Sequence, residues 1–474
     1  MFREAGKFMS NMSKTKQYIF FVAGAVVMMS VTLSSYGIAT VTPALLTKFN
    51  AMQHYTLTSL MASIGMLLFL PIVGKLTDTV GRQPLLIIGA VITLVSSLAA
   101  GFATSFPFFL VMRALITIGS ACLTPMPSST LPFVFERSKL PQLYGIQGAF
   151  LALGAFFGST IAGFLSDLGV PWMALAYPGV LGAAGALVML ALCPDIPRKP
   201  MPSIDFGGIA LLFCIVGPAM YVSSFGNKLG WGSPYILGGI IVLITAVIVF
   251  INLEKRVKSP LVDLNLFKSP VYTGALLCTF LMTWYQSSMR IYVPLAIQNV
   301  MGMSAAVSGS VLLPRSILNI IFPTLCGAWV AKNQHERCWK GILITGLLIA
   351  AGNLMLCFLS PTTTLMVFFI GLGLTGIAES FKQSSVMPAM QSTLTAENMG
   401  SGMSLNSMMG SMGSAISACV FGVIFDSVAP DTSIVSDLTA ASNAVFMVAA
   451  VSGVVVAVLA FLLVRPKKAA PAAS

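Results

Sequence analysis

The sequence GKLTDTVGRQ, residues 74–83, sets the pattern from which the fold of this chain can be predicted. It is a short charged segment between two apolar runs, residues 56–73 and 84–103. Each run is long enough to cross a bilayer, since about 20 apolar residues form one membrane-spanning helix. The two glycines of the segment allow backbone angles that other residues resist, so we expect a tight turn between two antiparallel helices.

The alternation of apolar runs and short polar segments continues along the whole chain. Fourteen apolar runs can be counted, and each predicts one membrane-spanning helix. The runs are residues 18–46, 56–73, 84–103, 108–132, 144–166, 172–193, 206–225, 234–253, 271–297, 306–331, 342–360, 365–390, 402–428 and 442–464. An even number of spans places both termini on the same side of the membrane.

The basic residues indicate which side that is. If the tails and alternate loops face the cytoplasm, they hold 20 of the 26 Lys and Arg residues, and the outer loops hold only Lys48 and Lys228. Cytoplasmic loops are enriched in Lys and Arg, and a missed or extra span would scramble this ratio. We therefore expect 14 transmembrane helices and both termini in the cytoplasm, in a multi-pass protein of the cell membrane, plasma or bacterial inner.

The composition excludes several other classes of protein. Of the 474 residues, 57% are hydrophobic and 8% charged, whereas soluble proteins carry about 25% charged residues. The net charge of +12 lies in short loops without a nucleic-acid motif, so we expect no nucleic-acid partner. Eight singly scattered cysteines and two loop histidines predict no metal site, and no cofactor is expected. No catalytic nucleophile–base pair can be recognised in the sequence, so we do not expect an enzyme.

The spacing within segment 74–83 resembles a known signature. Gly74, Asp78, Gly81 and Arg82 match the Gly-x-Leu-x-Asp-x-x-Gly-Arg loop between spans two and three of the major facilitator superfamily. The resemblance implies a gating loop, in which the aspartate engages the start of span thirteen near residues 400–404. An aspartate can satisfy exposed N–H groups at a helix start and interact with the positive end of the helix dipole.

The number of spans narrows the resemblance to one branch of that family. Fourteen spans exceed the twelve of the common facilitator core, and the chain resembles the fourteen-span drug:proton antiporter branch, which has an extra helix pair between two six-helix bundles. The expected fold is all-α, with an N-terminal six-helix bundle at 1–193, a linker with the inserted pair at 194–270, and a C-terminal six-helix bundle with its tail at 271–474. We expect a monomer in the lipid bilayer.

Span five carries glycines whose spacing favours close helix packing. Gly154, Gly158 and Gly163 are four or five residues apart, and small residues at such spacings let membrane helices approach closely. The antiporter signature of the branch has this glycine pattern, but with Pro and Gly where this chain has Ser159 and Ala162. These two differences argue against antiport, but not against membership of the superfamily. Generic helix packing is the alternative interpretation of the glycines.

Five charged side chains fall well inside predicted spans, at least five residues from either end. Arg113, Arg290, Arg315 and Lys382 are basic, and Glu379 is acidic. Charged residues within membrane spans are expensive and mark substrate or ion pathways, so all five are candidates for substrate binding or coupling. Glu379 and Lys382 are three residues apart on one helix and can pair. The remaining positive excess favours an anion.

Other interpretations of these residues stay open. Arg113 matches the arginine of the family's span-four pattern, and a structural arginine bonded to backbone carbonyls is the alternative to a role in coupling or substrate attraction. Glu379 is placed deep enough to carry a proton, whereas a permanent pair with Lys382 would be structural. Trp284, Tyr285 and Gln286, near Arg290, suit an amphipathic ligand, but a core stripe explains them equally well.

These observations predict a secondary active transporter that moves a small amphipathic organic anion, such as a bile-acid-like carboxylate, by alternating access. The sequence has no ATP-binding loop, so the energy must come from an ion gradient or from the substrate's own gradient, and the resemblance implies protons. Multidrug efflux by drug:proton antiport is the alternative, although residues 33–37 are neutral where drug exporters usually have an aspartate. A membrane receptor that binds without transport is an alternative of another class.

Overall fold

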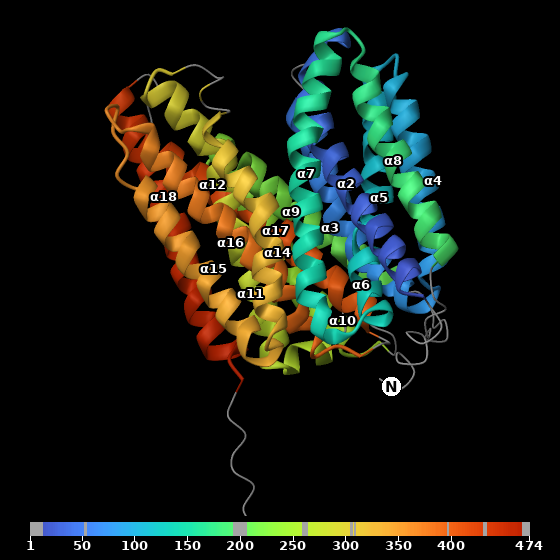
Figure 1. Ribbon diagram of the computed structural model, residues 1–474. Coiled ribbons are helices and arrows are strands. Elements are labelled where there is room, and N and C mark those ends of the chain that lie inside the picture. Colours follow the sequence, from blue (N-terminus) through green and yellow to red (C-terminus); the bar gives the residue numbers. More distant parts are fainter. Residues whose placement is uncertain are drawn as a thin grey trace, which may run out of the picture. The chain divides into compact units, whose positions relative to one another are not determined.

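The computed structural model describes residues 13–51, 55–192, 206–257, 264–303, 307, 310–395, 398–429 and 434–466. Every regular element within these residues is a helix (Figure 1). Each of the predicted apolar runs overlaps a helix, and 11 helices of the described chain are long and apolar enough to cross a membrane. The predicted all-α membrane fold is therefore confirmed, whereas the count of fourteen spans and the cytoplasmic termini stay predictions.

The helices of the described residues fall into two compact units. Unit 1 is drawn from Met1–Arg137, Ala149–Leu264 and Thr395–Ala415, and unit 2 from Ser138–Gly148, Asn265–Leu394 and Ile416–Ser474. The helices with residues in unit 1 only are α2 (Lys14–Lys48), α3 (Tyr55–Thr79), α4 (Arg82–Gly101), α5 (Phe106–Leu123), α6 (Pro125–Val134), α8 (Pro171–Leu192), α9 (Phe206–Leu229) and α10 (Pro234–Glu254). Those with residues in unit 2 only are α11 (Pro270–Met282), α12 (Trp284–Leu295), η4 (Ala296–Val300), α14 (Leu313–Ala331), α15 (Gln334–Leu356), α16 (Leu365–Gln391), α18 (Val435–Leu459) and η5 (Ala460–Val464).

Two long helices contribute residues to both units. They are α7 (Leu140–Asp167) and α17 (Met399–Val428). Two short 3₁₀ turns, η2 (Arg137–Lys139) and η3 (Leu264–Lys268), precede α7 and α11. The division predicted from the sequence, with an inserted pair between two bundles, stays a prediction.

The turn predicted over residues 74–83 is much shorter than expected, because most of the segment is helical. α3 continues to Thr79 and α4 begins at Arg82, which leaves two residues between them. The N–H groups of those two residues lie 2.8 and 3.3 Å from the carbonyl oxygen of Leu76 and close the end of α3. Gly81 then turns the chain with a φ of 104°, a backbone angle that favours glycine.

Gly74 lies inside α3, where it permits a close contact within unit 1 instead of a turn. A Cβ atom on Gly74 would lie 2.6 Å from the Cβ atom of Ser404 and 3.2 Å from the carbonyl oxygen of Gly400, both at the start of α17. No side chain fits in that space. The prediction that both glycines shape a turn was therefore wrong for Gly74, whose role is to let α3 and α17 touch.

Two predicted spans are each built from more than one helix. Run 108–132 is divided at Thr124 into α5 and α6, because Pro125 has no N–H group and clashes with the preceding turn. Run 271–297 is divided at Thr283 into α11 and α12. The Thr283 hydroxyl donates to the carbonyl oxygen three residues earlier at 2.8 Å, a local bond that competes with the helical pattern.

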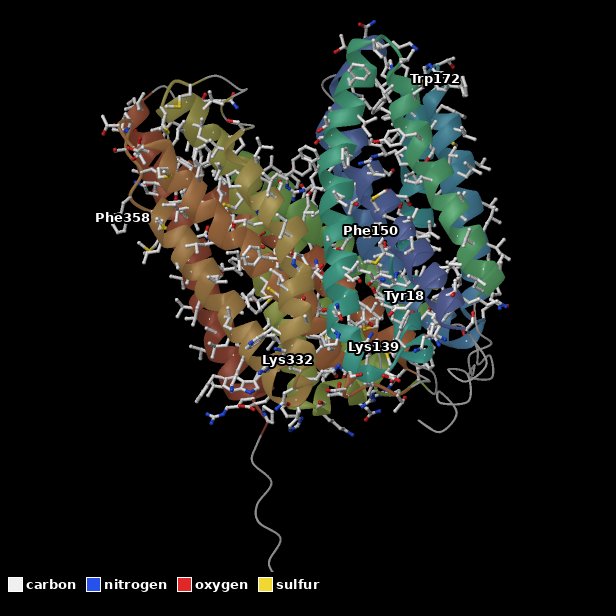
Figure 2. The ribbon with its side chains drawn as sticks, in the orientation of Figure 1. Tyr18, Lys139, Phe150, Trp172, Lys332 and Phe358 are labelled. Atoms are coloured by element: carbon white, nitrogen blue, oxygen red, sulfur yellow. The ribbon has the colours of Figure 1, made fainter. Side chains whose placement is uncertain are left out.

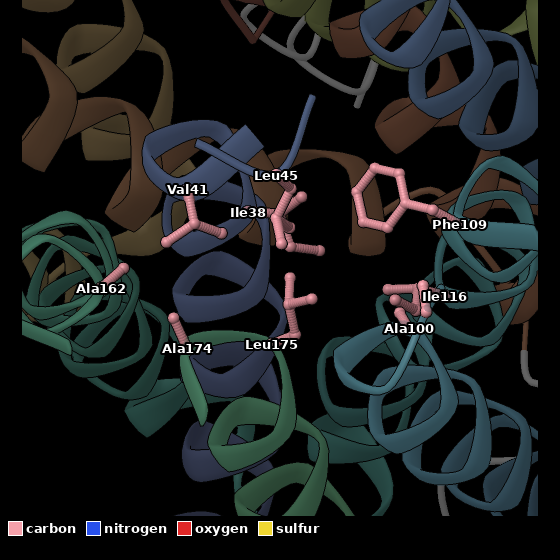
Figure 3. Packing of buried hydrophobic residues seen from close by; sticks show 10 residues of the cluster. Ile38, Val41, Leu45, Ala100, Phe109, Ile116, Ala162, Ala174 and Leu175 are labelled. Atoms are coloured by element: carbon pink, nitrogen blue, oxygen red, sulfur yellow. The ribbon is translucent and has the colours of Figure 1, made fainter. Parts of the chain in front are cut away.

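Unit 1 contains an apolar core that combines large side chains with alanines. Figure 3 shows this core, to which α2, α4, α5, α7 and α8 contribute. Its buried members include Ile38, Val41, Leu45, Ala100, Phe109, Ile116, Ala162, Ala174 and Leu175. Because lipid is as apolar as these side chains, van der Waals packing is what brings such helices together, and the alanines let their backbones approach.

Large apolar side chains also point outward from both units. Phe164 and Leu187 of unit 1 are 64% and 66% exposed, and Phe358 of unit 2 is 74% exposed. Figure 2 shows the Phe358 side chain projecting away from the helices. An outer surface of this kind fits a lipid environment, since every face of a membrane-spanning bundle that meets lipid is apolar.

Candidate functional site

The charged residues predicted inside the membrane lie closest together in unit 2, on α16. This helix lies beside α14 and α15 (Figure 1). Its buried polar side chains are Thr375, Glu379, Ser380, Ser384, Ser385 and Gln391. Glu379, in the middle of this stripe, is only 5% exposed. Buried polar groups in an apolar helix must find partners within the protein, so the partners of Glu379 define the site.

Four side-chain donors surround the carboxylate of Glu379. Its Oε1 atom accepts from Lys382 Nζ at 3.0 Å, the pair expected from their spacing, and from Gln383 Nε2 at 3.2 Å. Its Oε2 atom accepts from Gln286 Nε2 at 2.8 Å and from the hydroxyl group of Tyr285. A carboxylate has about four lone-pair sites, so these bonds satisfy its ionised form. Because two donors come from α16 and two from α12, the carboxylate ties these helices together.

A second cation, Arg315 of α14, lies beside these groups. Its guanidinium carbon is 5.7 Å from the centre of the Tyr285 ring, a distance at which a cation is attracted to an aromatic face. Its charge also interacts with Glu379. α14 can approach α16 here because a Cβ atom on Gly376 would lie 2.6 Å from the Arg315 carbonyl oxygen. We call Tyr285, Gln286, Arg315, Glu379, Lys382 and Gln383 the Glu379 cluster; it has two positive charges and one negative.

Aromatic side chains extend from this cluster along α12 and α17. Trp284 meets Phe421 edge to face, with 6.0 Å between ring centroids. Tyr292 lies 6.3 Å from Phe421 and 5.2 Å from Phe425. Such pairs contribute about 0.5–1.5 kcal/mol beyond their buried area. The cluster therefore adjoins a largely buried group of aromatic rings that meet mostly edge to face.

The first turns of α7 pack against α14 and α16 within unit 2. A Cβ atom on Gly145 would collide with the backbone of α14, and one on Gly148 would lie 2.8 Å from Cγ of Gln383. Gln391 Nε2 donates to the hydroxyl oxygen of Tyr144, and both side chains are buried. α7 thus touches the Glu379 cluster directly, through Gln383.

Arg113 lies apart from these residues, on α5 in unit 1. Its side chain is half-buried, and its Nε atom is enclosed without a hydrogen bond in the part of the chain that the structure describes. α5 is held close to α3 at this level, because a Cβ atom on Gly65 would lie 2.9 Å from the methyl group of Thr117. The structure thus gives the Arg113 Nε no backbone carbonyl partner among the described residues.

The other predicted site residues have separate environments. Arg82 is buried, with its guanidinium carbon 4.9 Å from the centre of the Phe133 ring. Arg290 shares α12 with Tyr285, but its side chain is exposed and forms none of the four bonds to the carboxylate. The side chain of Asp78 lies outside the described residues.

The glycines of span five face α2 within unit 1. A Cβ atom on Gly154 would lie 2.6 Å from the carbonyl oxygen of Met29, and one on Gly158 would lie 2.9 Å from that of Leu33. At Gly163 the nearest group is a single side-chain methyl, 4.0 Å away. Close backbone approach thus involves the first two glycines, and the third has room for a side chain.

Several residues of the site were missed in the sequence. Gln383 stands one turn after Glu379 on the same helix face, and that spacing could have identified it. No sequence signal pairs Tyr144 with Gln391, because the two residues are 247 positions apart. Tyr285 and Gln286 were expected as ligand contacts or as part of a core stripe, and not as donors to Glu379.

A bundle of apolar helices that encloses a charged cluster is typical of membrane transporters. The chain belongs to the major facilitator superfamily, whose family model matches residues 20–207 and 204–418. The predicted family is thereby confirmed. Transport across a membrane, and not catalysis, is the activity of this superfamily.

Several relatives by sequence are named as drug transporters. Multidrug resistance protein 3 of Bacillus subtilis (strain 168) is 25% identical over 357 residues, which are 75% of this chain and 69% of the relative. Multidrug transporter protein MdtP of the same organism is 26% identical over 359 residues, 75% of this chain and 65% of the relative. The matches thus span about two thirds of the length of these relatives, and the chain is similar to the drug-efflux transporters of the superfamily.

Solved structures share the fold at lower identity. The human organic anion transporter MFSD10 matches with a TM-score of 0.66 and 15% identity, over 94% of this chain and 99% of that one. The proton:xylose symporter XylE matches with a TM-score of 0.64 and 13% identity, over 96% and 97%. These likenesses establish the architecture.

Proposed function

We propose that the protein is a secondary active transporter that moves a small amphipathic organic anion together with protons across the cell membrane, and that it works as a monomer. The observation that carries this proposal is the Glu379 cluster, in which Lys382 pairs with a buried carboxylate and Arg315 lies beside the ring of Tyr285, another of its donors. The net positive charge of the cluster favours an anionic substrate. The hydrogen bonds of Glu379 suggest the proton as the coupling ion.

Protonation of Glu379 changes the charge that a substrate meets. It removes the only negative charge of the cluster, so that Arg315 and Lys382 become available to a substrate carboxylate. Proton binding and anion binding then favour each other, and this reciprocal linkage is what proton:anion symport requires. A cationic substrate would instead compete with the proton for Glu379, and two neighbouring cations would repel it.

Protonation also changes how two helices are held. The ionised carboxylate accepts two bonds from α12 and two within α16. A protonated carboxyl group has one donor and less acceptor capacity, so it cannot keep all four. Loss of the bonds to Tyr285 and Gln286 would free α12 to move, and would couple the proton to the change between inward and outward access.

The aromatic residues define the rest of the substrate. Trp284, Tyr285 and Phe421 offer rings beside the cations, so a molecule with a rigid apolar body and one carboxylate matches the site. A bile-acid-like carboxylate is a concrete example. Arg113, on α5 of unit 1, remains a separate candidate for attracting the anion.

Multidrug efflux by drug:proton antiport is the second candidate. Its support is the similarity to relatives named for multidrug resistance. The two candidates differ in the sign of the linkage, because a proton favours the binding of an anion and opposes that of a cation.

Transport by the purified chain in proteoliposomes tests this proposal. Vesicles with an alkaline interior either receive labelled cholate outside or are preloaded with labelled tetraphenylphosphonium, with and without a protonophore. We expect cholate to accumulate inside and the protonophore to abolish the accumulation. Exchange of tetraphenylphosphonium for protons without movement of cholate would support the antiporter instead.

A further inference from the structure

Basic side chains gather at one end of unit 2, where α14 ends, α15 begins and η5 ends. They are Lys332, Arg337, Lys340 and Arg465. Figure 2 shows Lys332 at this end of the unit. None of the four belongs to the Glu379 cluster.

Aromatic rings hold three of these cations in place. Arg337 lies 5.1 Å from the centre of the Trp329 ring and donates from Nη1 to the Trp329 carbonyl oxygen at 2.8 Å. Lys340 and Arg465 lie 5.9 and 5.5 Å from the centre of the Trp339 ring. Each interaction is attractive by about 0.5–1 kcal/mol at an exposed site and fixes the direction of the charged group.

Acidic side chains neutralise little of this positive charge. Glu336 accepts from Lys340 at 2.5 Å, and its other oxygen accepts from Asn333. The described ion pairs include none with Lys332, Arg337 or Arg465. We call the four cations with Trp329, Trp339 and Phe461 the basic–aromatic patch, and it has a clear excess of positive charge.

Side chains from the end of the last helix contact the Trp339 ring, and the distribution of loop charges does not explain this contact. The positive-inside rule accounts for basic residues in each loop, but not for the stacking of Arg465, from the end of the last helix, on a ring at the start of α15. Phe461 also meets Trp339, with 6.3 Å between ring centroids. Phe461 and Leu462 are 47% and 63% exposed, so an apolar surface adjoins the cations.

We propose that the basic–aromatic patch binds the phosphate headgroup of an anionic phospholipid. Guanidinium groups match phosphate oxygens in geometry, and basic pockets between helices are known to bind such headgroups. The patch lies at the end of membrane helices, where tryptophan rings sit at headgroup level. The exposed side chains of η5 would meet the acyl chains of the same lipid. The first turn of α15 adds the positive end of a helix dipole.

Native mass spectrometry of the full chain, purified and stripped of lipid, tests this site with phosphatidylglycerol as the probe. Arg337→Gln combined with Arg465→Gln removes two cations of the patch. Lys255→Gln combined with Arg256→Gln is the matched control, since these exposed residues at the end of α10 remove equal charge elsewhere. One cation near a membrane surface contributes about 1 kcal/mol, which is about fivefold in affinity. We therefore expect about a twenty-five-fold weaker affinity in the patch variant and less than about a twofold change in the control.

Two further measurements separate the site from its alternatives. Phosphatidylcholine should bind wild type and variants equally, and inorganic phosphate should not displace phosphatidylglycerol. Equal losses in the patch variant and the control would overturn the site, and displacement by inorganic phosphate would assign it to a soluble anion. If the double variant does not fold, Arg465→Gln alone, at an exposed terminal position, should still weaken phosphatidylglycerol binding about fivefold.

Discussion

Gly148 packs directly against the side chain of Gln383: a Cβ atom at position 148 would lie 2.8 Å from Cγ of the glutamine. Nε2 of Gln383 donates to Oε1 of Glu379 at 3.2 Å. The seating of α7 therefore sets the position of one of the four donors around the carboxylate. A movement of the first turns of α7 would displace the side chain of Gln383 and so change its hydrogen bond to Glu379.

Substitution of Gly148 tests this path. Gly148→Ala should displace Gln383 and weaken its bond to Glu379, so that the pH dependence of transport shifts and gradient-driven accumulation falls, by about tenfold if about 1.4 kcal/mol of coupling is lost. Gly163→Ala is the matched control on the same helix, because its nearest neighbour is 4.0 Å away. Measurement of uptake against pH distinguishes them; an unshifted profile in Gly148→Ala would show that Gln383 does not transmit the position of α7.

Glu379 should determine how transport responds to the proton gradient. Glu379→Gln keeps the shape of the side chain and removes its titration. In wild type the affinity for the anion should rise as the pH falls, because the protonated form leaves both cations to the substrate. The variant should bind the anion independently of pH, exchange it across the membrane and lose gradient-driven accumulation. If protonophore-sensitive accumulation survives in Glu379→Gln, another group carries the proton or the coupling ion is not a proton.

The cations of the site should discriminate by charge. Arg315→Gln and Arg113→Gln should each weaken binding of an anionic substrate by about tenfold, and that of a neutral analogue of similar shape much less, since only the charge interaction is lost. Arg290→Gln, at an exposed position on α12, should change neither. Competition assays with the two ligands measure the ratio. Equal losses for charged and neutral ligands would make these arginines structural.

The contact between Gly74 and Ser404 should be sensitive to a single methyl group. Gly74→Ala would place its Cβ atom 2.6 Å from the Cβ atom of Ser404, so the close approach of α3 and α17 must open and transport should slow while the protein still reaches the membrane. Ser404→Gly in the same chain removes the clashing atom and should restore the rate. Rates of exchange in proteoliposomes provide the test. A Gly74→Ala chain that transports like wild type would contradict a gating role for this contact.

Much of the fold follows from the sequence because the lipid environment imposes it. Each apolar run became helix, since a backbone in lipid must satisfy its own hydrogen bonds. The pairing of Glu379 with Lys382 follows from helical spacing alone. The length of the turn after α3 did not follow, because residues 75–79 are charged or polar except for Leu76, and such a segment is still compatible with a helix that extends beyond the apolar region.

The remaining parts of the site depend on contacts between distant segments. Gly145 and Gly148 resemble any other glycines in a span, and their role appears only where α7 meets α14 and α16. The bond between Gln391 and Tyr144 is equally invisible in the sequence. Such contacts depend on which faces of neighbouring helices meet, and hydropathy does not encode that choice.

The central claim is that a proton on Glu379 and an anion on Arg315 and Lys382 favour each other, and proton uptake on substrate binding tests it most directly. Cholate is added to the purified transporter in weakly buffered solution at a fixed pH, and the change in free proton concentration is followed with an indicator dye. Wild type should take up protons as cholate binds, and Glu379→Gln should bind cholate without proton uptake. Proton release by wild type, or equal uptake by the variant, would contradict the claim.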